Sequence, residues 1–558
     1  MARHAGAYRS EELGVTYDLV LKDGRLQLRA GRERVSLRPG ARNELEGTGS
    51  RTVRLPETGA NRFWLSVPGA SGLLFERVSD SVRFEPVRRQ IADLLATTGT
   101  PSVAVGVARD GQVLWEEAFG WADRERRIRA TPRTSYLLAS TSKPITATGL
   151  MTLVEAGRVE LDRPANDYLG DAKLTAKVGA AADATLRRLA NHSAGLPKHF
   201  QYFFCDEPPR RPAMDVTIGR YGNLVTAPGE GYIYSNLGTG LLGEVASRVS
   251  HKSFPEYMRD AVFGPLGMSD TYVYECGSRH ADEAVRYDQV NRPLPPFVSD
   301  TPGAADIFSS ARDLVRFGMF HLDGVVAGGK PILSRAALEG MHVPQTVVNL
   351  DRSYATGWHV QDRSDGYRVV YHGGGLAGAS AVLMLIPEQR IVLVVLINRF
   401  SRIDSRDLGR EVSNGLAKTL LPDWYLKEPE GGREDRRTAS VDTLRGVWEG
   451  SLLADSREIP LRLEFPGSDA ARVDFDGSGW QPLEDAHLGD DWLSGMFAGD
   501  VGTADANRYR PNSIELALKR RGDALEGGAT VSSPAQRPYI AGMTMTLTHW
   551  VRLKRRTE

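Results

Sequence analysis

Ser140 and Lys143 are the residues of this chain whose types and spacing best suit covalent chemistry. They follow the apolar stretch 136–139 and stand at the start of an expected helix that runs to about Ala156. Residues at i and i+3 share a helix face, so the lysine amine can reach the serine oxygen. A serine hydroxyl needs a neighbouring base, and burial can depress a lysine pKa by roughly 3–5 units, which makes the amine such a base. The pair therefore predicts a serine nucleophile with a lysine base.

Tyr234 and Asn236 form the second element. They follow a Pro-Gly turn and precede a helix expected over 237–249. A phenol beside an ammonium can shuttle a proton, and an asparagine amide can donate a hydrogen bond to a substrate carbonyl. The same spacing occurs at 221–223, and the change from loop to helix favours the later copy. The alternative interpretation is a turn that carries a core tyrosine.

His372 and the glycines after it, with Gly374 and Gly375 among them, form the third element. It is expected at the end of a strand over 367–371, where glycines let a substrate approach bare backbone. The backbone N–H groups of Ser140 and Gly375 would make an oxyanion hole, in which one donor lowers the barrier by roughly 2.7–4 kcal/mol. His-x-Gly also occurs elsewhere in the chain, and a lone histidine is more often a hydrogen-bonded structural residue.

The elements that must position these residues are expected to form one α+β domain over 81–426. Between about 160 and 350 the chain mixes helices with loops rich in proline and glycine. Strands from both ends of the segment enclose this helical middle. Alternating or continuous apolar runs predict these strands at 103–107, 113–119, 367–371, 379–386 and 390–397.

Two smaller β domains are expected on either side. Residues 1–80 alternate apolar and polar side chains, with Asp23-Gly24 as a hairpin turn. Residues 427–440 are charged, contain proline and glycine, and are expected to be a linker. Alternation returns over 441–558 and predicts a second β-barrel. We expect the β domains to be packing or dimerisation modules; ligand carriage, or loops that narrow access to the active site, are the alternatives.

The composition argues against several classes of protein. Lys+Arg and Asp+Glu both number 70, so no net charge favours nucleic acid or an anionic membrane. The apolar run 391–397 is far below membrane-spanning length, and the first residues lack the apolar core of a signal peptide. Cys205 and Cys276 are too few for a disulfide framework. We expect a cytoplasmic protein with reduced thiols, although one disulfide or a lost export signal stays open. No metal or cofactor motif is found.

The three elements, in this order, resemble those of the serine β-lactamase and penicillin-recognising hydrolase superfamily, most closely its class C, D-aminopeptidase and esterase branch. The resemblance covers about residues 85–425. Four further segments match in the same order, namely Asn191 to Pro197, Gly264 to Met268, Ser309 to Leu314, and Gly357-Trp358.

The resemblance implies a role for each residue of the three elements. Ser140 would be the acylated nucleophile, and Lys143 and Tyr234 would share the duties of base and acid. Asn236 would orient the substrate. His372 would line the site, beside the glycines that supply the second oxyanion N–H.

One departure from the pattern concerns the substrate. Many penicillin-recognising relatives have a lysine where this chain has His372, so a permanent cation that faces a substrate carboxylate is lost. This weakens the case for penicillins and suits esters, amides or short peptides better.

The outer domains and an aromatic loop also have counterparts in the resemblance. Residues 445–558 resemble the lipocalin-like barrel that follows the catalytic domain in several D-peptide hydrolases, and residues 7–79 look like a shortened copy in an unusual N-terminal place. The aromatic segment 199–204 lies where relatives build a pocket wall, and ordinary core packing explains it equally well.

The sequence therefore predicts a cofactor-free serine hydrolase that forms an acyl-enzyme on a small molecule or short peptide. Hydrolysis of a small D-amino-acid peptide or amide comes first, esterase or acyltransferase activity second, and β-lactamase activity third. A penicillin-sensor-like binding protein that does not turn over is the rival from another class. No nucleic-acid or membrane partner is expected, and a homodimer is left open.

Overall fold

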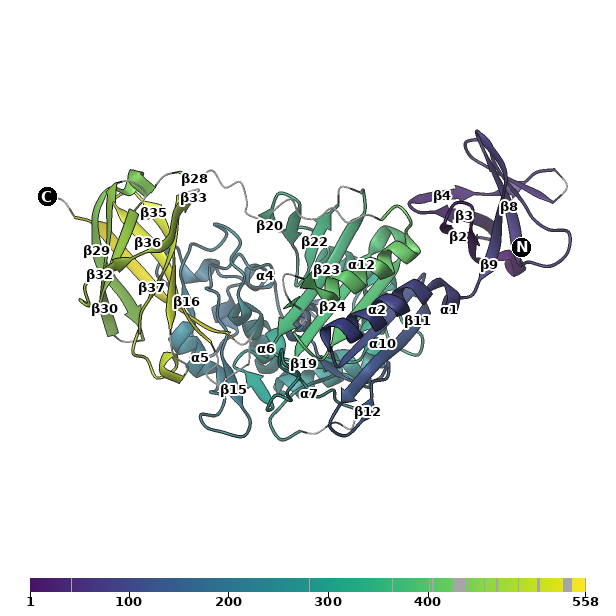
Figure 1. The fold of residues 1–558 in the computed structure, drawn as a ribbon. Helices are drawn as coiled ribbons and strands as arrows, with labels where there is room; N and C mark the ends of the chain where they lie inside the picture. The colour runs from purple at the N-terminus through teal and green to yellow at the C-terminus, as the bar shows by residue number, and fades with distance from the viewer. Residues whose placement is uncertain are drawn as a thin grey trace.

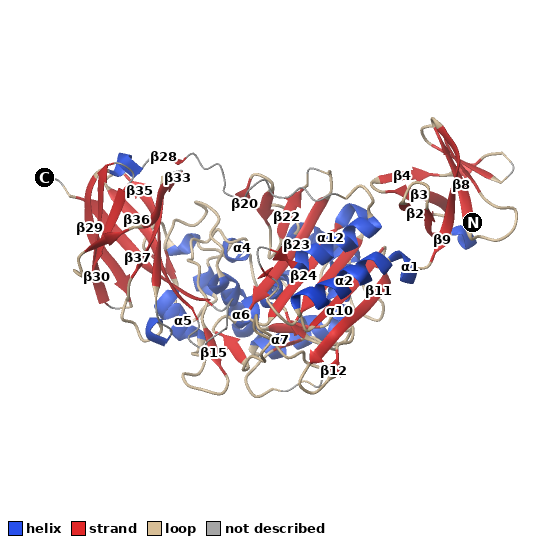
Figure 2. Cartoon of the chain, viewed as in Figure 1, coloured by secondary structure: helices blue, strands red, loops and turns tan. Residues whose placement is uncertain are grey.

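The computed structural model describes most of the chain, and three large sheets follow one another in it (Figures 1 and 2). A mixed α/β body lies in the middle, and nearly closed, barrel-like sheets lie at its two ends. This confirms the predicted fold class. The described residues are 1–41, 43–278, 280, 282–363, 365–400, 402–403, 406–424, 438–439, 441–455, 457–467, 470–489, 491–508, 512–534 and 544–556.

The middle body is built on one antiparallel sheet, in the order β12-β11-β10-β25-β24-β23-β22-β21-β20. Its strands are β10 (Ser102–Arg109), β11 (Gln112–Asp123), β12 (Ile128–Arg129), β20 (Thr346–Asn349), β21 (Arg352–Tyr354), β22 (His359–Asp362), β23 (Arg368–Leu376), β24 (Ala379–Ile386) and β25 (Ile391–Ile397). Short strands pair elsewhere: β13 (Tyr136–Leu137), β14 (Thr175–Ala176), β15 (Tyr202–Phe204), β16 (Asn223–Leu224), β17 (Tyr272–Val273), β18 (Phe297–Ser299), β19 (Ile307–Ser309), β26 (Arg402–Ile403) and β27 (Arg406–Asp407).

Helices cover both faces of this sheet and fill the middle of the chain. They are α1 (Asp80–Arg83), α2 (Glu85–Thr98), α3 (Ser142–Glu155), α4 (Leu186–Ala190), α5 (Met214–Tyr221), α6 (Asn236–Ser250), α7 (Phe254–Met258), α8 (Gly264–Leu266), α9 (Pro302–Ala305), α10 (Ala311–Asp323), α11 (Arg335–Met341) and α12 (Leu408–Leu420). Single turns of 3-10 or π type add η2 (Ala139–Thr141), η3 (Ala165–Asp167), η4 (Ala181–Asp183), η5 (Arg259–Phe263) and η6 (Pro387–Gln389).

The two faces of the sheet explain its apolar strands. Val103 and Val105 of β10 pack with α2 and α12 on one face, whereas Ala104 packs with the core around α3 and α10 on the other. β25 is buried along its whole length for the same reason. It pairs with β10, so strands from the two ends of the domain lie side by side, with Val103 opposite Ile397.

The N-terminal sheet has the order β4-β3-β2-β1-β9-β8-β7-β6-β5 and encloses its own apolar core. The predicted turn at Asp23-Gly24 joins β2 to β3, and both residues have positive φ, as a two-residue hairpin turn requires. The elements are η1 (Ala2–His4), β1 (Gly6–Ser10), β2 (Val15–Lys22), β3 (Arg25–Ala30), β4 (Glu33–Ser36), β5 (Arg38–Pro39), β6 (Glu44–Gly47), β7 (Arg51–Arg54), β8 (Arg62–Val67) and β9 (Ala70–Val78).

The C-terminal sheet has the order β28-β33-β34-β35-β36-β37-β29-β30-β31-β32. Inward residues such as Trp448, Leu463 and Leu547 are fully buried. Most of the expected linker 427–440 lies outside the described residues. The elements are η7 (Val441–Leu444), η8 (Ala506–Arg508), β28 (Thr438–Ala439), β29 (Gly446–Ala454), β30 (Arg457–Gly467), β31 (Ala470–Phe475), β32 (Trp480–Pro482), β33 (Glu484–Gly489), β34 (Trp492–Ala498), β35 (Ser513–Arg521), β36 (Ala524–Pro534) and β37 (Thr544–Arg555).

Two local predictions need correction. The helix expected from Ser140 begins at Ser142, because residues 139–141 form a 3-10 turn. The His372 motif lies inside β23 rather than at a strand end, since the strand continues through Leu376. The glycines are tolerated there because one face of the strand is packed closely against the Ser140 turn, as described below.

The cysteines also differ from expectation. Cys205 and Cys276 form a disulfide rather than two reduced thiols, with their Cα atoms 5.3 Å apart. The fold brings together two loops that are 71 residues apart in sequence, a proximity that cysteine spacing does not reveal. Among the described residues, no helix combines the length and the apolar character needed to cross a membrane.

Candidate active site

The turn that carries Ser140 lies at the N-terminal end of α3 and begins with a strained residue. Ala139 has φ +47°, which is costly for a residue with a Cβ, and it immediately precedes Ser140. Strand β23 crosses directly beside this turn, and a Cβ placed on Gly374 would lie 2.0 Å from the carbonyl oxygen of Leu138. Glycine at 374 is therefore what lets the two segments approach, and this explains one of the predicted site residues in steric terms.

Lys143 is completely buried, and burial lowers its pKa well below the ordinary lysine value. Its Nζ lies 3.0 Å from Ser140 Oγ, 2.8 Å from Asn236 Oδ1 and 3.1 Å from the carbonyl oxygen of Ala304. A neutral amine has two N–H groups and one lone pair. The amide and carbonyl oxygens only accept, so they take the two N–H groups. The lone pair is then left for the hydroxyl proton of Ser140.

Tyr234 completes the contact with the serine. Its hydroxyl is hydrogen-bonded to the Ser140 side chain, and its ring centroid lies 4.7 Å from Lys143 Nζ. Burial raises the tyrosine pKa, so the phenol is neutral near pH 7. The phenol can therefore pass a proton on but does not act as a standing base, which leaves that part to the lysine.

Asn236, the first residue of α6, is held at both ends of its amide. Its Oδ1 accepts from Lys143, and its Nδ2 donates to the backbone carbonyl of His199 at 2.8 Å. In the structure this amide holds the lysine. The expected role of Asn236 in orienting substrate stays a prediction.

His372 is buried and neutral. Its Nδ1 lies 2.8 Å from the carbonyl oxygen of Gly373, which can only accept, so Nδ1 carries the proton. Nε2 then accepts from the hydroxyl of Tyr354 at 3.0 Å. Burial is the main reason that the pKa of His372 is well below its ordinary value. Gly375, three residues further along β23, is exposed, and the oxyanion role of its N–H stays a prediction.

A ring of aromatic and imidazole side chains behind the site was missed from the sequence. His192 contacts both Tyr234 and Tyr354, with ring centroids 4.5 Å apart in each pair, and accepts at Nδ1 from the backbone N–H of Ser235. His359 lies 4.7 Å from the Tyr354 ring. Burial lowers the pKa of both histidines, that of His359 to about 3.

The sequence contained a signal for one of these residues only. His192 stands inside the segment 191–197 that matched the superfamily, whereas Tyr354 and His359 belong to no motif. They join the site because β21 and β22 pair in antiparallel register, with Tyr354 opposite His359.

Arg352 adds a positive charge near these neutral aromatic and imidazole side chains. It lies on β21 two residues before Tyr354, and alternate residues of a strand share a face. Its charge helps to lower the pKa of His359. Burial raises the pKa of Tyr232, and the charge of Arg352 opposes part of that rise. In the part of the chain that the structure describes, no group of three or more His, Cys, Asp or Glu side chains is placed to hold a metal ion.

The aromatic segment 199–204 is buried, not exposed in a pocket wall. Its β15 pairs with β18, and Phe200 forms a two-way backbone bridge with Thr546 of the C-terminal barrel. The packing interpretation therefore describes this segment, with the addition that part of the packing is against another domain.

Comparison with known proteins gives the class. The Beta-lactamase family model matches residues 87–416, which is more than half of the chain, and the chain belongs to this family. The match includes every residue of the three sequence elements.

Two curated relatives show how far the likeness extends. Protein flp of Staphylococcus aureus (strain N315) is 25% identical over 307 residues, which are 53% of this chain and 59% of that protein. Penicillin-binding protein 4* of Bacillus subtilis (strain 168) is 26% identical over 348 residues, or 56% of this chain and 72% of that protein. The chain thus spans about three fifths of the length of the flp relatives it matches.

Solved structures share the fold. SurE covers 85% of this chain and 100% of its own, with a TM-score of 0.57 and 19% identity. The octameric penicillin-binding protein homologue from Pyrococcus abyssi covers 84% of this chain and 99% of its own, with a TM-score of 0.52 and 21% identity. A class C beta-lactamase covers 62% of this chain and 98% of its own, with a TM-score of 0.52 and 18% identity.

Proposed function

We propose that this protein is a serine hydrolase that works through an acyl-enzyme on Ser140. The observation that carries the proposal is the buried Lys143 amine, whose Nζ lies within hydrogen-bond distance of Ser140 Oγ and of two oxygens that can only accept. In the neutral amine, those two oxygens take the N–H groups and leave the lone pair for the serine hydroxyl. A lysine held in this way is a base near neutral pH, and a serine within 3.0 Å of it is an activated nucleophile.

Acylation begins when Ser140 Oγ bonds to the carbonyl carbon of an amide or ester and its proton moves to Lys143 Nζ. The carbonyl electron pair moves onto oxygen, and the backbone N–H groups of Ser140 and Gly375 stabilise this oxyanion. As the tetrahedral intermediate collapses, the bond to the leaving group breaks. The proton passes from Nζ through the Tyr234 hydroxyl to the leaving nitrogen or oxygen.

Deacylation reverses these roles. A water molecule gives a proton to the same Tyr234 and Lys143 pair as its oxygen bonds to the acyl carbon. Collapse of the second intermediate breaks the ester bond, and Ser140 Oγ takes the proton back. An alcohol or amine in place of water would make the product an ester or amide, which is the acyltransferase alternative.

For the substrate, we place a small peptide or amide with a D-amino acid first. His372 is neutral and offers no cation, but Arg352 on the same face of β21 as Tyr354 supplies one. A guanidinium there would bind a carboxylate on the leaving group of a short peptide. A structure of SurE has been determined with D-Leu, and this makes D-amino acids the first probes to use.

The experiment that tests the function is covalent labelling. Wild-type protein exposed to an alkyl fluorophosphonate should gain one adduct by intact mass, and Ser140→Ala should gain none. Equal labelling of both proteins would exclude Ser140 as the nucleophile. Labelling without turnover of D-alanyl anilides, p-nitrophenyl esters or nitrocefin would favour the penicillin-sensor-like alternative.

The same substrates test the specificity. Arg352→Gln should raise KM for a dipeptide with a free C-terminal carboxylate and leave KM for a neutral p-nitrophenyl ester unchanged. An equal effect on both substrates would remove Arg352 from carboxylate recognition and would favour the esterase alternative.

The cellular location follows from the cysteines. Disulfides persist in oxidising compartments and are rare in the cytosol, so the Cys205–Cys276 bond weighs against the predicted cytoplasmic location. Thiol titration of unfolded protein, isolated without reductant, should detect no free thiol. Two free thiols would restore the cytoplasmic interpretation. Sedimentation of the whole chain would distinguish a monomer from a homodimer.

A further inference from the structure

The C-terminal barrel contacts the catalytic domain at the segment that holds Asn236. The contact is made by the first residues of β37, where the strand has a neighbour on one side only. β36 pairs with β37 throughout, whereas β29 pairs with it from Trp550 onward. The free edge of β37 at 544–549 is thus available to another segment.

Segment 198–200 occupies this edge. Phe200 and Thr546 exchange both of their backbone hydrogen bonds, at 2.9 Å each. Two residues further along β37, Thr548 Oγ1 donates to the carbonyl oxygen of Lys198 at 2.6 Å. The barrel therefore holds the backbone on both sides of His199.

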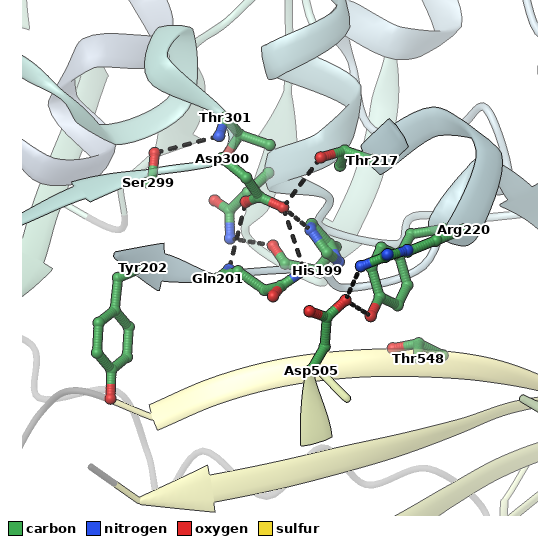
Figure 3. A network of polar contacts seen from close by, with 12 residues as sticks. His199, Gln201, Tyr202, Thr217, Arg220, Ser299, Asp300, Thr301, Asp505 and Thr548 are labelled. Atoms are coloured by element: carbon green, nitrogen blue, oxygen red, sulfur yellow. Dashed lines mark hydrogen bonds and ion pairs between the residues drawn. The ribbon is translucent and has the colours of Figure 1, made fainter. Parts of the chain in front are cut away.

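The catalytic domain binds the side chain of His199 from the opposite side. Its Nε2 lies 2.7 Å from Asp300 Oδ2, and both side chains are fully buried. Asp300 also accepts from Gln201 and Thr217, so the carboxylate is the centre of a small network (Figure 3). The barrel strand that carries Thr548 runs directly beside this network in the same view.

The carbonyl of His199 then fixes the Asn236 amide. A carbonyl oxygen only accepts, so it selects the NH₂ end of that amide, at 2.8 Å. The oxygen end is thereby turned toward Lys143 Nζ, at 2.8 Å. If the amide rotated by half a turn, it would present N–H groups to the lysine. The amine would lose an acceptor, and its lone pair would no longer be directed at Ser140.

We propose that His199 is a positioning residue, and that the barrel acts through Thr546 and Thr548 to fix the Asn236 amide and the lysine that it holds. The C-terminal barrel is then part of the support of the active site. This inference rests on the proposed function, because it concerns the activation of Ser140 by Lys143.

A second contact of the barrel reaches the other loop of the site. Lys519 and Arg521 of β35 both bind Glu230, at 2.6 Å each. Glu230 lies four residues before Tyr234, and its carboxylate also accepts from the backbone N–H of Ala227 in the same loop. The barrel thus contacts both segment 198–200, which bonds to Asn236, and the loop that leads to Tyr234, as expected of a supporting element.

The test compares two substitutions in one interface. Thr548→Val keeps the side-chain shape and removes the hydrogen bond to Lys198, together with a contact to the Thr530 hydroxyl inside the barrel. Arg220→Gln, the matched control, removes the ion pair that Arg220 forms across the interface with Asp505, 2.8 Å away, and leaves the hydrogen bond from the Tyr221 hydroxyl to Asp505 in place. For wild type and both variants, the rate of labelling by an alkyl fluorophosphonate is measured across the pH range, together with the thermal midpoint of unfolding.

We expect Thr548→Val to slow labelling by about tenfold, less than the roughly 100-fold that a 1 Å misplacement can cost. The pH at half-maximal rate should also shift, because the hydrogen bonds of Lys143 change. Arg220→Gln should keep the wild-type rate and lower the midpoint only slightly, because the Arg220 side chain is partly exposed. Asp300→Asn loosens His199 from the other side, and it should behave like Thr548→Val; it decides the question if the threonine variant does not fold.

The outcomes separate the two proposals. No labelling of wild type would overturn the proposed function itself. Normal labelling of wild type with equal rates and pH profiles in Thr548→Val, Asp300→Asn and Arg220→Gln would overturn the positioning role. The same result would reduce the barrel to a packing module.

Discussion

At the scale of single residues, the protonation state of Lys143 decides whether the site can work. The amine donates to two oxygens that can only accept, and none of its hydrogen-bond partners in the described part of the chain is a carboxylate. Burial without a counter-charge penalises the ammonium, so the neutral form is favoured. The same geometry that lowers the pKa also aims the lone pair.

The pH dependence of labelling follows from this shift. Because the pKa of Lys143 is lowered, the rate should rise as pH increases through that lowered pKa and stay flat above it. The pH at which the rate is half-maximal should therefore lie well below 10.5, the ordinary lysine pKa. Fluorophosphonate labelling in a series of buffers measures it. A rate that still climbs at pH 10 would mean that the amine is solvated.

Tyr234→Phe separates proton transfer from base strength. The substitution keeps the ring beside Lys143 and removes the hydroxyl that is bonded to Ser140. Loss of one positioned acid–base group should slow turnover of an anilide by about 10²–10⁴-fold. The midpoint of the pH profile should not move, because the base is unchanged. A profile that moved strongly would transfer the role of base to the phenol.

At the scale of elements, the approach of β23 to the Ser140 turn is the decisive contact. Adjacent glycines of this strand differ sharply in their surroundings. A Cβ on Gly374 would lie 2.0 Å from the Leu138 carbonyl oxygen, whereas one on Gly373 would meet nothing closer than 3.9 Å.

Gly374→Ala should therefore push the strand away from the turn. We expect a loss of about 1–3 kcal/mol in the free energy of unfolding, as for overpacked sites. Labelling should fall by roughly 100-fold if the displacement reaches 1 Å. Gly373→Ala is the matched control and should keep wild-type stability. Urea unfolding and labelling rates measure both effects, and equal stabilities of the two variants would contradict the steric argument.

Beneath α3 a chain of neutral histidines supports the helix that carries Lys143. Thr148 donates to the Pro144 carbonyl, so it accepts from His321 Nε2; His321 Nδ1 then accepts from His342 Nε2, 3.1 Å away. Burial lowers the pKa of His342 to about 4. Between pH 6.5 and about 4, His342 is protonated in the unfolded chain but not in the folded chain. The free energy of unfolding should therefore fall over this range.

His342→Gln tests this cluster, because glutamine can still donate but does not titrate. Between pH 7 and pH 4.5 the free energy of unfolding should decrease in both proteins, and the decrease in His342→Gln should be smaller than in wild type by about 1–3 kcal/mol. His487→Gln, an exposed position in the barrel, should leave the wild-type slope unchanged. Identical slopes in all three proteins would show that His342 is not a source of acid sensitivity.

At the scale of the whole molecule, the N-terminal sheet is fastened by a buried charge. Asp18 of β2 binds Arg83 at 3.0 Å and Arg109 at 2.5 Å. Burial raises the pKa of Asp18, but the two guanidiniums outweigh it and the net shift is downward. Its contribution to stability is thus present above the ordinary aspartate pKa and is lost as pH falls through the lowered value.

Asp18→Asn leaves two buried guanidiniums without their counter-charge. We expect a loss of about 3–5 kcal/mol in the free energy of unfolding, as for other broken buried pairs. Glu11→Gln, at an exposed pair with Arg9, should cost less than about 1 kcal/mol. Labelling of Ser140 should be unaffected by either variant, because the ion-pair partners of Asp18 among the described residues are Arg83 and Arg109, which do not belong to the site. Urea unfolding and labelling give the two readouts.

The sequence by itself determined the local parts of this protein. Turns such as Asp23-Gly24, apolar runs such as 391–397 and the i, i+3 spacing of Ser140 and Lys143 depend on neighbours in the chain, so their signals are local. The strand at 379–386 was predicted with the bounds that the structure has. The three sequence elements also led to the family that the comparison identified.

Only the tertiary structure decided which distant groups surround those parts. Tyr354 and His359 reach the site through strand register, the His199 carbonyl reaches Asn236 through a loop, and Cys205 meets Cys276 across two loops. None of these contacts has a sequence pattern, because each depends on how separate elements pack. The neutrality of Lys143 belongs to the same class, since burial is a property of the assembled fold and not of the residue.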